Sequence, residues 1–268
     1  MQFVRHYLLA LQFFTRVPVT GRLAQWVGFS PAMLRASAAH FPGVGWLVAA
    51  VGSVTTAAVW LALEGRTFGP LAAALAGTIA TVLLTGAFHE DGLADVADGL
   101  GGSADRARSL EIMKDSRIGA FGALAMILAL GFKVVLLAVL GEKMLAPMLC
   151  ALVGAHALSR LAPLVLVATL PHVGDTATSK SKPLADQIAP TAMLYALLWC
   201  LPPLALVAWF QGPLFLLCAC IASAVGLAWM WRLFSRRLQG FTGDCLGATQ
   251  QVCEIAFYLG AAVSTGLA

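Results

Sequence analysis

Charged side chains are scarce in this sequence. Asp, Glu, Lys and Arg make up 11% of its 268 residues, hydrophobic residues make up 60%, and the mean hydropathy is +0.85. Soluble domains carry roughly a quarter charged residues. The composition therefore argues against a soluble domain. It predicts an all-α, polytopic helical membrane protein in which residues 1–268 form one integral membrane domain.

The sequence also lacks the spacings that would build a cysteine site. Its six cysteines form no CxxC pair and no zinc-finger pattern, and most lie in apolar segments, where cysteine packs as a small hydrophobe. We therefore expect no disulfide framework. The sequence shows no convincing internal repeat, whereas many transporters are built from two inverted repeats. The N-terminal apolar run is short and no small-residue cleavage site follows it, so we expect no removable signal peptide.

Apolar segments of membrane-spanning length are, by contrast, abundant. A helix needs about 20 apolar residues to cross a bilayer. Residues 3–17 predict a helix at the membrane surface or beneath the bundle, and residues 20–42 predict a polar connector. A weaker span contains Gln250, Gln251 and Glu254, which must face protein or a cavity if it crosses. We predict six to seven spans: 43–63, 69–88, 119–140, 145–170, 191–210, 213–232 and, as the weaker one, 246–267.

The basic residues are distributed unevenly between the two predicted sides. Four precede the first span, four lie between the second and third, two between the fourth and fifth, and three after the sixth. The opposite side has only Arg66 and Lys143. Because cytoplasmic loops carry the excess of Lys and Arg, we expect the N-terminus and residues 89–122 to face the cytoplasm.

Residues 89–122 hold seven of the thirteen acids of the chain. Asp91, Asp95 and Asp98 have the spacing i, i+4, i+7, so a helix would place them on one face. Three carboxylates on one face repel one another unless a cation compensates, and carboxylate oxygens suit Mg²⁺. We predict a metal site here, with Gly92 and Gly99 leaving room for a substrate. A solvated acidic loop is the plainer alternative.

Other polar residues near this segment are candidates for catalysis or substrate binding. His89 is a candidate base or metal ligand, although a histidine at the end of a span is more often a hydrogen-bonded interfacial residue. Lys114, Asp115 and Arg117 form a mixed pattern that suits a polyphosphate. Ordinary positive-inside charge would explain the signs of the two basic residues but not the mixed pattern.

Three further places carry candidate substrate contacts. Arg160 lies within an apolar segment, where it either pairs with an anion in the bundle or extends to the surface. Lys180 and Lys182 belong to a polar loop that is either a lid over an anionic substrate or only a connection. Thr242 and Asp244 lie between glycines before an apolar segment. A segment of this composition can present its backbone N–H groups to a phosphate. A turn before a helix is the commoner reason for finding such residues together.

The motifs together resemble those of the cobalamin synthase family, the membrane-bound adenosylcobinamide-GDP ribazoletransferases. The similarity runs in the order of the family and covers essentially the whole chain. The acidic block and the KDSRIG block are its specific parts. The matching stretches are FFTRVPV (13–19), FPGVG (41–45), FHEDGLADVADGLGG (88–102), IMKDSRIGAFG (112–122), SR (159–160), SKSKP (179–183) and FTGDCLGA (241–248).

The resemblance implies a reaction and a set of roles. Members join adenosylcobinamide-GDP to α-ribazole or its 5′-phosphate, release GMP and require Mg²⁺. It implies that Asp91, Asp95 and Asp98, with Glu90, hold the metal, and that basic residues including Lys114 and Arg117 neutralise the diphosphate. His89 or one of the acids would take the proton of the attacking hydroxyl. It also implies a multi-pass protein of the bacterial inner membrane that binds small molecules and lipid but no nucleic acid. A homo-oligomer stays open.

Two other functions compete with this interpretation. CDP-alcohol phosphotransferases also place several Asp over a diphosphate, but their signature has AR after DG and a G-x3-D-x3-D tail. Here the step from Asp95 to Asp98 is three residues, and no suitable AR follows. A small-molecule transporter fits the composition, and His156, Arg160 and Glu254 would line its path. Most acids lie in one segment outside the spans, however, which favours the transferase.

Overall fold

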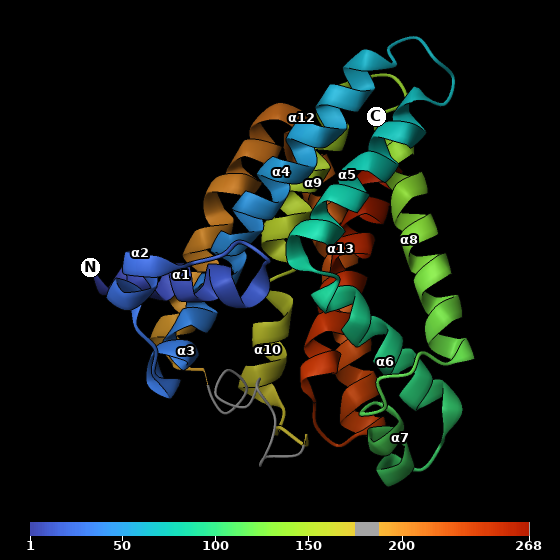
Figure 1. Cartoon of the computed structure of the whole chain (residues 1–268). Helices are drawn as coiled ribbons and strands as arrows, with labels where there is room; N and C mark the ends of the chain where they lie inside the picture. The colour runs from blue at the N-terminus through green and yellow to red at the C-terminus, as the bar shows by residue number, and fades with distance from the viewer. Residues whose placement is uncertain (175–187, 268) are drawn as a thin grey trace.

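The computed structural model describes residues 1–174 and 188–267, and these are helical with no strand. The all-α prediction is therefore confirmed. The helices lie side by side in a bundle, with a smaller group of short helices at one flank (Figure 1). Their bounds are α1 Gln2–Phe14, α2 Gly21–Val27, α3 Pro31–Ser37, the 3-10 turn η1 Ala38–His40, α4 Phe41–Ala62, α5 Gly69–Thr85, α6 Phe88–Gly102, α7 Arg106–Ile112, α8 Ala120–Leu140, α9 Leu145–Leu158, α10 Ala162–Thr169, α12 Pro190–Arg237 and α13 Gly243–Thr265.

The apolar helices fall close to the predicted spans, but fewer of them pass a strict test of length and hydropathy. In the described residues four stretches do: Pro31–Ala62, Ala120–Leu140, Leu145–Thr169 and Pro190–Arg237. A fifth counts if α5 and α6 form one bent span. The last stretch, α12, is broken at Gly212, whose φ of 83° is non-helical, so it holds both segments predicted as separate spans. Helix α13 fails the test because its polar residues lower its hydropathy.

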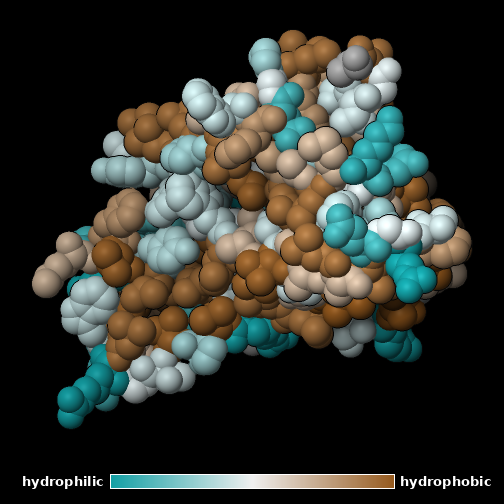
Figure 2. Space-filling model, turned by 90° about the horizontal axis from the view of Figure 1, so that it is seen from above, coloured by the Kyte–Doolittle hydropathy of each residue, from teal (hydrophilic) through white to brown (hydrophobic). Residues whose placement is uncertain are grey.

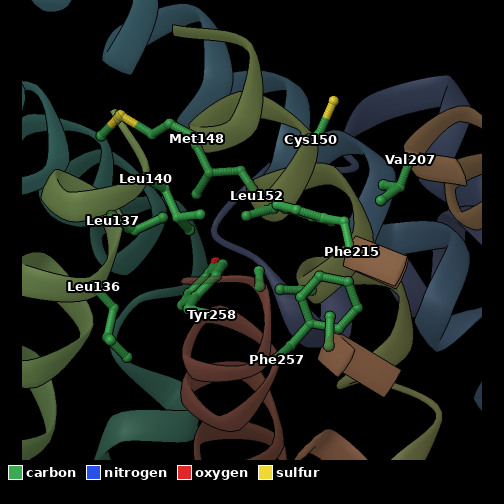
Figure 3. Close-up of a cluster of buried hydrophobic side chains, with 14 of the residues drawn as sticks. Leu136, Leu137, Leu140, Met148, Cys150, Leu152, Val207, Phe215, Phe257 and Tyr258 are labelled. Carbon is green, nitrogen blue, oxygen red and sulfur yellow. The ribbon is translucent and has the colours of Figure 1, made fainter. Parts of the chain in front are cut away.

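Helix α13 nevertheless lies in the centre of the bundle (Figure 1). Gln250, Gln251 and Glu254 are all buried, as a span carrying them requires. Its apolar side packs into a cluster with α8, α9 and α12 that includes Leu137, Leu152 and Phe257 (Figure 3). The polar helix is thus surrounded by apolar ones.

The outer faces of the bundle are apolar, as contact with lipid requires. Large hydrophobic side chains are exposed along the length of the spans, among them Leu83 on α5, Leu128 on α8 and Trp209 on α12. Seen from above, hydrophobic residues cover much of the surface and hydrophilic ones form separate patches (Figure 2). Soluble monomers rarely expose so much contiguous apolar surface.

The segment 20–42, predicted as a polar connector, is instead largely helical. It forms α2, α3 and η1, which pack on the predicted N-terminal helix α1 at the flank of the bundle. Ser30 caps α3 by accepting a hydrogen bond from the N–H of Met33, and Pro31 follows it at the first helical position. This cap was readable in the sequence, but α3 is too short to give a clear periodic pattern.

The chain turns sharply where α5 meets α6. Gly86 and Ala87 both have left-handed backbones, with φ of 68° and 57°, and the two helices meet at 90°. The apolar helix α5 suits the bilayer. Helix α6 carries the polar residues of the acidic block, namely His89, Glu90, Asp91, Asp95 and Asp98. We therefore treat α6 as lying outside the spans.

Candidate functional site

Helix α6 carries the predicted acidic face. Residues 88–102 are helical, so Asp91, Asp95 and Asp98 share one side of α6, as their spacing predicted. Their surroundings differ along this side, because Asp91 is exposed, Asp95 is half-buried and Asp98 is buried. The three carboxylates therefore do not have equivalent roles.

Asp98 acts as a cap for the next long helix. Its carboxylate accepts hydrogen bonds from the N–H of Gly119 at 2.7 Å and of Gly122 at 2.8 Å, at the start of α8. Such bonds satisfy otherwise unpaired donors, and the negative charge suits the N-terminal end of the helix dipole. A Cβ on either glycine would collide with the carboxylate. Asp98 thus joins α6 to α8, and its predicted metal-binding role stays a prediction.

Asp244, from the first turn of α13, is the carboxylate that faces α6. The two helices touch at Gly92, where a Cβ would lie 2.7 Å from the carbonyl oxygen of Asp244. Gly99 likewise lies against Met113 and Ser109. The prediction that Gly92 and Gly99 leave room for a substrate is therefore wrong, because protein atoms fill both places.

The approach of α13 brings charges of one sign together. Burial and the nearby carboxylates of Asp244, Asp91 and Asp98 raise the pKa of Asp95 to about 7. Burial, with a smaller effect of Asp91, also raises the pKa of Asp244. Thr242 caps α13 by accepting from the N–H of Cys245, and its hydroxyl donates to Asp244 at 3.2 Å. Thr242 and Asp244 thus shape the acidic face itself.

These side chains fit Mg²⁺ as a partner of a phosphate ligand, not as the occupant of a closed protein cage. Among residues 1–174 and 188–267, no group of three or more His, Cys, Asp or Glu side chains is arranged to hold a metal ion. Mg²⁺ usually takes only one or two carboxylates and completes its shell with water and substrate phosphate oxygens. The mutual repulsion of Asp95 and Asp244 is what such a cation would relieve.

The raised pKa of Asp95 has a consequence for stability. Because its pKa in the folded protein, about 7, exceeds the ordinary 3.8, its contribution is fully present below pH 3.8 and is lost as the pH rises through 7. Above pH 7, without divalent cations, Asp95→Asn should raise the free energy of unfolding by roughly 1–2 kcal/mol, allowing for partial exposure. Thermal unfolding in EDTA at pH 5 and pH 8 checks this. The exposed Glu64→Gln is the control, and an equal effect of Asp95→Asn at both pH values would contradict the prediction.

The basic pair predicted to bind phosphate lies beside this face, in the loop between α7 and α8. Arg117 is exposed and pairs with Asp115 at 2.6 Å. Hydrogen bonds from the Arg117 side chain and backbone lower the pKa of Asp115 to about 2. Lys114 is exposed in the same loop, and Gly119, bound to Asp98, ends it. Lys180 and Lys182 lie outside the described residues.

His89 and Glu90 point away from the acidic face. They are 2% and 5% exposed, and they face a buried polar cluster because a helix rotates about 100° per residue. Glu90 accepts a hydrogen bond from Gln251 at 3.1 Å, and the His89 ring stacks on Phe41 with centroids 5.6 Å apart. The structure therefore does not bring Glu90 together with Asp91, Asp95 and Asp98.

Arg160 belongs to the same buried cluster and not to a surface site. It is 2% exposed, and its guanidinium donates to the carbonyl of His156 at 2.9 Å. Of the two alternatives left open by the sequence, burial in the bundle is the one that the structure shows, and extension to the surface is excluded. Its contact with substrate stays a prediction. In this arrangement Arg160 lies in the buried cluster and not at the acidic face, where the phosphate is expected.

An ion pair that the sequence analysis did not predict lies at the centre of the cluster. Lys133 of α8 and Glu254 of α13 are both 1% exposed and lie 2.5 Å apart. Gln250 and Tyr258 also donate to the Glu254 carboxylate, at 2.6 and 3.0 Å. Gln251 then joins Gln250 to Glu90, so the hydrogen bonds run from α8 through α13 to α6. The sequence held one sign of this pair, because a lysine and a glutamate of opposite charge lie inside two different apolar segments.

Comparison with known proteins identifies the family. The model of the family described as cobalamin-5-phosphate synthase matches residues 6–262. A protein of Albidiferax ferrireducens named adenosylcobinamide-GDP ribazoletransferase is 62% identical, over 98% of this chain and 99% of its own length. Proteins of the same name are 59% identical in Polaromonas naphthalenivorans, over 98% and 99%, and 39% identical in Vibrio cholerae, over 94% and 91%. No solved structure matches. The chain belongs to the cobalamin-5-phosphate synthase family, as its motifs predicted.

Proposed function

We propose that this chain transfers the phospho-corrinoid of adenosylcobinamide-GDP to α-ribazole or its 5′-phosphate and releases GMP. Membership of the family supports the reaction, and the full-length relatives carry the name of this activity. The observation that carries the site is the meeting of Asp95 on α6 with Asp244 on α13, beside a loop that holds Lys114 and Arg117. Carboxylates and basic side chains are the groups that diphosphate chemistry requires.

Mg²⁺ is the proposed cofactor. Asp95 and Asp244, with Asp91 at the exposed end of the face, would hold it. When bound, the ion supplies positive charge to the diphosphate oxygens and to the departing GMP. The protein contributes position: Gly92 lets α13 approach α6, and Asp98 fixes α8 and its preceding loop against the same helix.

The attacking hydroxyl of the ribazole needs a group that accepts its proton. His89 is almost fully buried and stacked on Phe41, so a substrate hydroxyl does not reach it in this arrangement. On the acidic face of α6, Asp91 is exposed and Asp95 is only half-buried. We therefore favour Asp95 or Asp91 over His89 as the acceptor. Retention of most activity in His89→Asn, with loss in Asp91→Asn, would support this choice.

Lys114 and Arg117 are proposed to neutralise the diphosphate. Lys114→Ala and Arg117→Ala should raise the KM for adenosylcobinamide-GDP by about ten- to a hundredfold each, since hydrogen bonds to charged groups contribute about 1.5–3 kcal/mol. The KM for α-ribazole should change little. Steady-state kinetics with each substrate varied in turn checks this, with exposed Arg22→Ala on α2 as the control. An unchanged KM for the corrinoid in both variants would count against the role.

The site is proposed to face the cytoplasm from the bacterial inner membrane. The N-terminal helices and the loop around Lys114 lie on the side that carries most of the basic residues. Ser116→Cys should react with a membrane-impermeant maleimide in inverted vesicles but not in intact spheroplasts. Lys143→Cys should show the opposite pattern. Labelling of Ser116→Cys from outside would reverse the proposed orientation.

GMP release is the direct test of the reaction. Purified protein receives adenosylcobinamide-GDP and α-ribazole, with Mg²⁺ or with EDTA. We expect GMP and a new cobalamin product only with the metal. Release that is equal in EDTA would reject the cofactor and keep the reaction. No product from folded protein would reject the reaction, and lipid-linked CDP substrates would then be tried.

A further inference from the structure

A large cavity in the described part of the chain lies away from the acidic face. Its volume is about 1030 Å³. Three walls form it: the start of α1, the end of α3 with η1, and the first two turns of α12. These elements make up the flank on the left of Figure 1. Its chemically distinctive lining residues are Gln2, Phe3, His6, Arg35, His40 and Tyr195.

The lining is aromatic and polar but almost uncharged. The indole N–H of Trp199 donates to Nδ1 of His40 at 3.1 Å, and because an indole can only donate, the His40 ring is neutral with its proton on Nε2. Burial, and to a smaller extent Arg5, lower the pKa of His6. Among the lining residues that the structure describes, the exposed Arg35 is the one with a permanent charge. The rings of Phe3 and Tyr195 lie 6.4 Å apart at the wall.

This lining suits a large molecule whose polar groups are uncharged amides. Imidazole, amide, hydroxyl and guanidinium groups can donate to or accept from carboxamides, and aromatic faces suit a flat conjugated ring. Pockets for drug-sized ligands measure about 300–1,000 Å³, so this cavity stands at the upper end of the range. A nucleoside such as α-ribazole would leave most of it empty. A corrin ring with its amide side chains would not.

The cavity is also close enough to the acidic helix to serve the same reaction. His40 lines it, and the next residue, Phe41, stacks on His89 at the start of α6 and on Phe14 with centroids 4.0 Å apart. These ring contacts connect the wall of the cavity to the first turn of α6 on the side of His89. A macrocycle held here would need its diphosphate-bearing arm to pass the first turn of α6 to reach Asp91.

We propose that the cavity between α1, α3 and the start of α12 binds the corrin macrocycle of the substrate, while the acidic face of α6 and α13 binds its diphosphate. This assignment rests on the proposed function, because it names where one part of that substrate lies. It divides the large substrate between two places, which the ring contacts of Phe41 connect.

Filling the cavity tests the proposal. Ala36 on α3 and Ala192 on α12 line opposite walls and are only partly buried, so Ala36→Trp and Ala192→Trp add bulk from either side. Each should raise the KM for adenosylcobinamide-GDP by roughly tenfold or more, equivalent to at least 1.4 kcal/mol of binding. The KM for α-ribazole should stay within about twofold. Ala224→Trp, in a hollow of about 180 Å³ between α12 and the junction of α9 with α10, is the matched control.

Direct binding separates this proposal from the reaction itself. Adenosylcobinamide without its GDP part is followed by its visible absorbance in equilibrium dialysis against wild-type protein and both filled variants. Wild-type binding that is lost in the filled variants supports the assignment. Equal binding to all three, or a raised KM for α-ribazole alone, overturns it. If wild-type protein releases no GMP, the proposed function fails instead.

A variant without added bulk covers the case in which the tryptophans prevent folding. Tyr195 is exposed at the cavity wall, so Tyr195→Ala leaves no buried hole. It should weaken adenosylcobinamide binding by about three- to tenfold through loss of ring contact. Unchanged binding by a monodisperse Tyr195→Ala protein overturns the assignment as well.

Discussion

Asp95→Ala is expected to lower kcat/KM for GMP release by about 10³-fold, the size of effect seen when one preorganised electrostatic group is removed. Asp95 faces Asp244 across the contact of α6 with α13, and both pKa values are raised there. Groups that repel one another in a half-buried place cost stability unless a ligand uses them. The expected loss is therefore catalytic and not structural.

The structure supplies a matched comparison on the same helix face. Within the described residues the Asp95 carboxylate accepts no hydrogen bond, whereas that of Asp98 accepts two from the start of α8. Asp98→Ala should therefore lower the free energy of unfolding, by about 1–2 kcal/mol as for other lost helix caps. Asp95→Ala should not. Measuring activity and thermal unfolding on both proteins separates the two roles. A folded Asp95→Ala enzyme with near-normal activity would contradict the assignment of Asp95 to the metal site.

This difference shows what the sequence could and could not predict. The i, i+4, i+7 spacing correctly placed three carboxylates on one face of a helix. It could not show that Asp98 caps α8, because that contact depends on a close approach across 21 to 24 residues. Nor could it show that Gly92 makes room for α13 instead of for a substrate. Both outcomes are set by how helices pack against one another.

The position of Glu90 and the short helices α2 and α3 also could not be predicted from the sequence. Glu90 precedes Asp91 in the chain, yet one step of helical rotation turns it toward Gln251 and away from the acidic face. Helix positions were predictable because long apolar runs need no tertiary information. The short helices α2 and α3 were not, since runs of seven residues carry too little periodicity. Resemblance to the family supplied the reaction, which residue spacing alone did not.

Lys133→Met is expected to lower the free energy of unfolding by about 3–5 kcal/mol, as for other buried pairs that lose one partner. The mutation would leave Glu254 charged, 1% exposed and without the lysine that it contacts in the middle of the bundle. The double variant Lys133→Met with Glu254→Met should recover only part of this loss, because Arg160 stays buried and charged in the same cluster without Glu254. Chemical unfolding in detergent micelles measures both, with the loop residue Lys143→Met as the control.

The ion pair also bears on catalysis, since its hydrogen bonds continue to the acidic helix. Glu254 binds Gln250, Gln250 binds Gln251, and Gln251 binds Glu90 in the first turn of α6. The double variant should therefore regain part of the stability without regaining full activity, because the hydrogen bonds that run from Glu254 to Glu90 on α6 are broken at their start. A double variant as stable and as active as wild type would show that the hydrogen-bond network is not needed for catalysis. A stable Lys133→Met single variant would show that Glu254 is not charged in the bundle, and the ion pair would lose its role.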